Sequence, residues 1–186
     1  MHVDVMWSTW EGPGLEHLRL TQNDDGILAE SIMLGVKDGE PFRVRYEIRC
    51  DGQWTPHDVT VELLGGKSVK LQSDGNGHWL SASVPVVALD GCIDVDISAT
   101  PFTNTLPIKR LELGAGISAN INVAYISVPD LDVRPLMQQY TCLVNTEEGG
   151  LYRFRSLASG FIAELPTDAN GLVIDYPQLW TRAWSR

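Results

Sequence analysis

The chain has 186 residues, of which 44% are apolar and 20% charged, and these values predict one soluble globular domain over residues 1–186. The 24 acidic residues outnumber the 14 basic ones and give a net charge of −10, which disfavours nucleic acid and anionic membrane surfaces as partners. Because apolar residues nowhere run on for about 18 positions, no integral membrane segment is expected.

Most of the chain is expected to form short strands joined by hairpins. Asp-Gly and related pairs, which tolerate positive φ, separate the apolar runs. Such turn signals fall at residues 23–26, 37–39, 65–66, 74–77, 147–150 and 168–171. Between them apolar and polar residues alternate, as Val44, Tyr46, Ile48 and Cys50 do with the charged residues between them. The pattern predicts a mainly β (α+β) protein with a largely antiparallel sheet.

One short helix is predicted in the second half of the chain. Asn104 or Thr105 could cap its N-terminus, and Pro107 would be tolerated in its first turn. Gly114 and Gly116 would end it. We see no linker and no internal repeat.

The segment 91–113 is the most informative for function because it places polar side chains in a stretch that otherwise resembles core. Its alternation puts Asp94 and Asp96 on one face of a strand, with Cα atoms roughly 6.6 Å apart. This face is either solvated or the wall of a polar pocket. Two carboxylates near that separation could serve as acid and base in an inverting glycoside hydrolysis. The alternative is a structural role, such as an ion pair between one of them and Arg110.

The polar residues that follow add to this candidate site. Thr100, Thr103 and Asn104 could bind an anion or sugar hydroxyls where the strand leads into the helix, or they could simply close the turn. Asp51 is expected to form an Asx turn. Trp10 and Trp54 could stack on a sugar ring or an acyl chain, although core packing is the alternative for each.

Other classes of site lack their signatures. Cys50, Cys92 and Cys142 are odd in number and far apart, which predicts buried free thiols in a reducing compartment. The four histidines are scattered, and no nucleotide-binding or serine-hydrolase motif is present, so no metal and no cofactor is expected. The first residues lack the pattern of a signal peptide, from which we expect a cytoplasmic location.

The block GCIDVDISATPFTNTLPIKRL at 91–111 resembles a family of bacterial proteins described as glycolipid-binding, formerly a domain of unknown function. The likeness extends to the start at residues 10–11, Tyr46 with the turn at 50–54, the GHW at 77–79, residues 139–140 and the closing block 171–182. The resemblance implies a spiral β-roll, in which a long, mostly antiparallel sheet wraps around a single short helix. It also implies a cavity for a glycolipid, and it brings no catalytic residues.

We therefore expect a non-catalytic protein that binds a glycolipid or another amphipathic small molecule. The alternatives are a structural or interaction module without a small ligand, and a hydrolase that acts on a glycolipid through Asp94 and Asp96. A homodimer is a further alternative, because we expect edge strands and exposed tryptophans near the C-terminus, Trp180 and Trp184, although fraying or packing would explain these residues equally well. The predicted ligand-binding residues are Trp10, Tyr46, Asp51, Trp54, Asp94, Asp96, Thr100, Thr103, Asn104, Arg110 and Tyr140.

Overall fold

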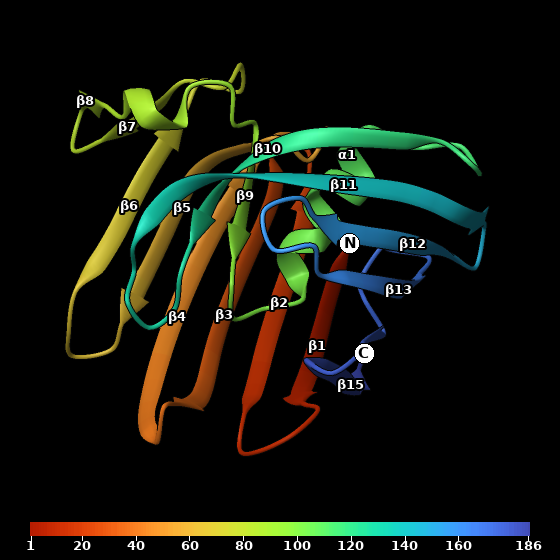
Figure 1. The fold of residues 1–186 in the computed structure, drawn as a ribbon, viewed down its shortest axis with the longest axis horizontal. Helices are drawn as coiled ribbons and strands as arrows, with labels where there is room; N and C mark the ends of the chain where they lie inside the picture. Colours follow the sequence, from red (N-terminus) through yellow and green to blue (C-terminus); the bar gives the residue numbers. More distant parts are fainter.

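The computed structural model describes residues 1–186 and consists of two β-sheets that enclose one short helix (Figure 1). The larger sheet has ten strands in the order β14-β15-β1-β2-β3-β4-β5-β6-β7-β8. Its bounds are β1 (His2–Thr9), β2 (Leu15–Asn23), β3 (Gly26–Lys37), β4 (Glu40–Cys50), β5 (Pro56–Leu63), β6 (Ser68–Ser73), β7 (Trp79–Ser81), β8 (Val84–Pro85), β14 (Asp175–Tyr176) and β15 (Trp180–Ser185). All of its pairings are antiparallel.

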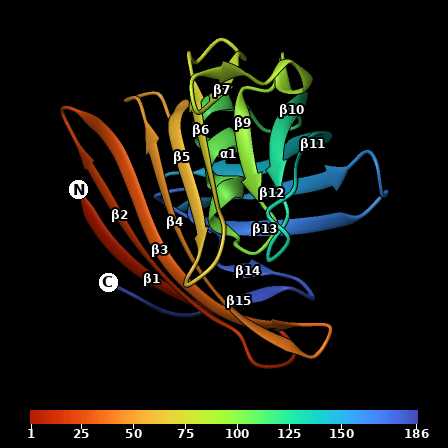
Figure 2. The same cartoon turned by 90° about the vertical axis from the view of Figure 1, so that its left-hand side faces the viewer.

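The smaller sheet has five strands in the order β13-β12-β11-β10-β9. Its bounds are β9 (Asp94–Ile97), β10 (Ser118–Ile126), β11 (Val133–Thr146), β12 (Gly149–Ser156) and β13 (Ile162–Asp168). The pair β9–β10 is parallel and the others are antiparallel. Figure 2 shows the helix α1 (Thr105–Leu111) between the two sheets. The predicted mainly β roll around a single short helix is thus confirmed, with its strands divided between two sheets.

The apolar side chains that alternate along the strands of the larger sheet point into the interior of the protein, as the sequence pattern predicted. Val44, Tyr46 and Ile48 on β4 are at most 1% exposed, whereas Arg45 between the first two is exposed. The buried residues of both sheets and α1 form one apolar cluster of 37 residues. Burial of this continuous surface is the main stabilising contribution to the fold. The three cysteines are buried and free, as predicted.

The helix begins at Thr105, as predicted, but its ends differ from those expected. The Asn104 side chain does not cap the helix; its Nδ2 instead donates to the Pro101 carbonyl, 3.1 Å away. The short 3₁₀ turn η2 (Phe102–Asn104) runs directly into α1, so the backbone is already helical before Thr105. At the C-terminal end of the helix, Glu112 has a φ of 45° and takes the left-handed conformation. We had expected a glycine, Gly114 or Gly116, to end the helix.

A segment near the C-terminus connects the two sheets. The Ile174 amide donates to the Pro166 carbonyl of β13, and the Ile174 carbonyl accepts from the Arg182 amide of β15, both at 2.8 Å. The remaining 3₁₀ turn, η1 (Val87–Leu89), lies between β8 and β9. No helix of the molecule has the length and apolar character needed to span a bilayer.

Candidate functional site

A cavity of about 350 Å³ opens on the inner face of the smaller sheet, beside the segment that connects the sheets. Strand register explains which side chains reach it. Asp96 on β9 is level with Tyr125 on β10, which is level with Arg134 on β11, so the three side chains point to the same side. Leu136 and Gln138 follow Arg134 on that face of β11 at intervals of two residues, and all five line the cavity.

The walls of the cavity are largely aromatic. Phe154 on β12 has an edge-to-face neighbour in Tyr176, with ring centres 6.2 Å apart, and Phe161 lies 6.3 Å from Phe154. Trp180, the first residue of β15, completes this wall and is 7% exposed. Such rings offer flat apolar surfaces on which a sugar ring or an acyl chain can pack.

The inner end of the cavity is polar and centres on Asp96. Its Oδ1 accepts a hydrogen bond from the Thr103 hydroxyl at 3.1 Å, and its Oδ2 accepts one from Gln138 Nε2 at 2.6 Å. Burial raises the pKa of Asp96, although both hydrogen bonds oppose that rise. A carboxylate has about four acceptor positions, so Asp96 retains acceptor capacity toward the cavity.

Two further polar groups in the cavity have no partner within the protein. Gln138 is 2% exposed, and its side chain makes one hydrogen bond, the donation from Nε2 to Asp96. The other polar atom of the amide, Oε1, therefore has no partner. The hydroxyl of Tyr176, a residue that is 7% exposed, likewise makes no hydrogen bond. Neither atom is among the fully buried atoms that lack a partner, so both are open to the cavity and offer it an unused acceptor and an unused hydroxyl.

Asn104 joins the same polar end from the start of the helical segment. Its Oδ1 accepts from the Tyr140 hydroxyl at 2.8 Å, and Tyr140 on β11 is itself 2% exposed. Asn104 lines the cavity, whereas Tyr140 supports it from behind. Both residues therefore lie at the cavity, but only Asn104 is placed to contact a ligand.

Thr100 also lines the cavity, but its hydroxyl is turned toward a buried glutamate on the larger sheet. Glu16 Oε1 accepts from Thr100 at 2.8 Å, from the Tyr46 hydroxyl at 2.6 Å and from Ser31 at 2.9 Å. Burial raises the pKa of Glu16 to about 7, and its Oε2 has no partner. This cluster ties the segment before α1 to the inner face of the larger sheet.

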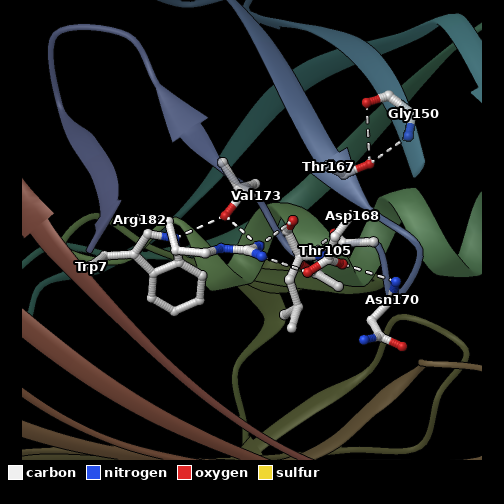
Figure 3. Close-up of polar contacts among 10 residues, drawn as sticks. Trp7, Thr105, Gly150, Thr167, Asp168, Asn170, Val173 and Arg182 are labelled. Carbon is white, nitrogen blue, oxygen red and sulfur yellow. Dashed lines mark hydrogen bonds and ion pairs between the residues drawn. The ribbon is translucent and has the colours of Figure 1, made fainter. Parts of the chain in front are cut away.

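A second cluster holds the segment that carries Tyr176 and Trp180 (Figure 3). Arg182 donates to Asp168 Oδ2 at 2.6 Å and to the carbonyl of Val173 at 2.8 Å. Thr105 Oγ1 on α1 donates to the Gly171 carbonyl at 2.9 Å. These bonds fix the loop after β13 against both α1 and β15, and so position the aromatic wall.

The two predicted aspartates have different surroundings. Asp94, which is fully buried, receives a two-pronged contact from Arg110 at 3.0 and 2.6 Å and does not line the cavity. Burial raises the pKa of Asp94 against the opposing effect of Arg110. The ion-pair alternative thus describes Asp94, while Asp96 lies in the cavity.

The other predicted residues lie away from this cavity. Trp54 is buried, with Lys109 Nζ 5.9 Å from its ring centre. Asp51 forms the expected Asx turn and accepts from the amides of Gln53 and Thr55, each at 2.9 Å. Trp10 is 52% exposed.

Reasoning from the sequence missed several cavity residues. Arg134, Gln138 and Phe154 lie far along the chain from the segment 91–113, and the register of β10–β12 brings them beside it. Tyr176, on β14 of the larger sheet, is placed there by its pairing with β15. The expectation that Trp180 is exposed is wrong, because β15 pairs with β1 and turns this ring inward; Trp184 is exposed. No group of three His, Cys, Asp or Glu side chains is close enough to hold a metal ion.

Residues 4–182 match the model of a family described as "Putative glycolipid-binding". The structure is similar to the crystal structure of a DUF1089 family protein from Pseudomonas aeruginosa, with a TM-score of 0.80 and 38% sequence identity. The similarity covers 93% of this chain and 95% of that one. No curated protein matches the chain.

Proposed function

The chain belongs to the "Putative glycolipid-binding" family, and from this premise we propose that it binds an amphipathic lipid, with the sugar headgroup in the cavity beside Asp96. The binding is non-catalytic. The observation that carries the proposal is the presence of unpaired polar groups, Gln138 Oε1 and the Tyr176 hydroxyl, in a cavity with aromatic walls. Small-molecule sites have this composition, with apolar walls and a few convergent polar groups.

The chemistry of the cavity suits a ring that carries several hydroxyl groups. Asp96 and Gln138 Oε1 can accept hydrogen bonds from hydroxyls, while the Tyr176 hydroxyl can donate one. Phe154 and Trp180 offer ring faces for the apolar side of a sugar. A cavity of about 350 Å³ is near the lower limit for ligand sites, which favours a headgroup inside and lipid chains outside.

The hydrolase alternative is disfavoured by the ion pair of Asp94. Its carboxylate is occupied by Arg110 at 2.6 and 3.0 Å, so it is poorly placed to exchange a proton with a substrate. Asp96 would then lack a carboxylate partner for acid–base catalysis.

Two tyrosine variants separate a binding site from a merely structural cavity. Tyr176→Phe removes a hydroxyl that has no protein partner, so the free energy of unfolding should stay within about 0.5 kcal/mol of wild type. Tyr140→Phe removes the hydroxyl that bonds Asn104 and should cost about 1 kcal/mol. Titration with octyl glucoside, followed by tryptophan fluorescence, should show weaker binding by Tyr176→Phe.

Native mass spectrometry of the purified protein provides an independent test, since a tightly bound lipid should survive as an added mass. The proposal fails if no lipid mass is found and octyl glucoside neither binds nor raises the melting temperature. Equal binding by wild type and Tyr176→Phe would place any ligand elsewhere. If the protein is a structural module without a ligand, no lipid mass should be found, and octyl glucoside should neither bind nor raise the melting temperature.

A further inference from the structure

The cavity contains one positively charged side chain, Arg134, near the start of β11. Asp96 is the one other charged residue among the 17 that line it. Arg134 is exposed, whereas Leu136 is partly buried and Gln138 is buried on the same face of the strand. The side chains thus lead from a charged rim to a polar interior.

Arg134 has no acidic partner, although the chain carries a net charge of −10. Some arginines on strands form ion pairs across the sheet, such as Arg45 with Glu62 at 3.0 Å and Arg153 with Glu164 at 2.7 Å, whereas Arg155, like Arg134, forms none. Arg134 makes no ion pair and no side-chain hydrogen bond, and its guanidinium carbon lies 5.4 Å from the ring centre of Tyr125. Its donors are therefore free to bind a ligand.

The position of Arg134 relative to the polar interior limits where an anion could bind. Four residues along β11 separate the Cα atoms of Arg134 and Gln138 by roughly 13 Å. Asp96 lies on β9, two strands from Arg134 on β11, with Tyr125 on β10 between them. Its carboxylate would repel a negatively charged group placed deep in the cavity. An anionic group would bind at the rim, with hydroxyl groups further inside.

We propose that Arg134 makes the cavity selective for amphiphiles whose headgroup carries an oxyanion, a carboxylate or a phosphate. This inference rests on the proposed function and specifies the class of its ligand. The planar guanidinium can donate two parallel hydrogen bonds to such a group. A neutral sugar would leave these donors solvated and gain nothing from them.

The test compares three probes with the same chain and sugar framework: octyl glucoside, octyl glucuronide and octyl glucoside 6-phosphate. Affinities are measured by calorimetry at low salt for wild type, Arg134→Gln and Arg155→Gln. Arg155 is the matched control because it is exposed on β12, makes no ion pair and does not line the cavity.

Wild type and Arg155→Gln should bind at least one anionic probe about tenfold more tightly than octyl glucoside, and Arg134→Gln should lose this preference. The preference should also weaken with added salt. Equal affinities for all three probes in wild type, or a preference that survives in Arg134→Gln, would overturn the inference but not the proposed function. Failure of all three probes to bind would overturn both.

Discussion

Trp7 and Arg182 donate hydrogen bonds to the same carbonyl oxygen, that of Val173, at 2.8 Å each (Figure 3). The guanidinium carbon also lies 5.9 Å from the centre of the Trp7 ring. One strand from each end of the chain thus holds the loop after β13. This loop leads to Tyr176 and Trp180, so the shape of the cavity depends on contacts made outside it.

Arg182→Met should therefore lower the free energy of unfolding and weaken binding in the cavity. The substitution breaks a largely buried ion pair with Asp168 at 2.6 Å, and such a loss typically costs about 3–5 kcal/mol. Urea unfolding measures this change. Arg153→Met is the control, because its ion pair with Glu164 is half exposed and should contribute less than about 1 kcal/mol. Equal losses in the two variants would contradict the role of Arg182.

Glu16 should make the protein less stable as the pH rises toward neutrality. Its pKa is raised from 4.5 to about 7, so between these values the folded state holds a proton that the unfolded state releases. The contribution of the Glu16 carboxyl group to the free energy of unfolding is therefore fully present below about pH 4.5. It is lost as the pH rises through about 7. The loss is on the order of 3 kcal/mol.

Glu16→Gln cannot titrate and should remove this part of the pH dependence. Its amide oxygen can still accept from Ser31, Tyr46 and Thr100. The measurement is urea unfolding at pH 5 and pH 8, with Glu30→Gln, an exposed change on β3, as the control. The free energy of unfolding should change less between pH 5 and pH 8 in Glu16→Gln than in Glu30→Gln. If it changes equally in both variants, the buried carboxyl of Glu16 does not bind a proton as described.

Asp94 and Arg110 should behave as a structural pair. Asp94→Ala leaves a mostly buried guanidinium without its partner and should cost about 3–5 kcal/mol. The double variant Asp94→Val with Arg110→Met should recover much of that loss, because it removes both charges. Since neither residue lines the cavity, the double variant should bind octyl glucoside as wild type does. Loss of binding in a stable double variant would instead include Asp94 in the site.

The sequence was sufficient to predict the strands, the short helix and the polar segment at 94–104, because these follow from local periodicity and turn chemistry. It could not distinguish Asp94 from Asp96, since both lie on the same face of β9. Their difference comes from Arg110, which reaches Asp94, and from Gln138, which reaches Asp96. Such partners depend on packing between elements that are distant in the chain.

The burial of Glu16 could have been predicted from the sequence, although we did not use the pattern that indicates it. Glu16 occupies the same face of β2 as Leu18 and Leu20, so alternation alone places it inside. An acidic residue in an inward position indicates a buried polar cluster. By contrast, nothing local to Tyr176 or Trp180 indicates the cavity, because their positions depend on the pairing of β15 with β1.

The pairing of β1 with β15 also has a consequence for biosynthesis. Thr9 is level with Trp180, so nearly the whole chain must leave the ribosome before this edge of β1 can be covered. Contacts between such distant residues slow folding, and an open strand edge invites association with other chains in the meantime. Nascent chains of this protein should therefore expose this edge of β1 until β15 pairs with it.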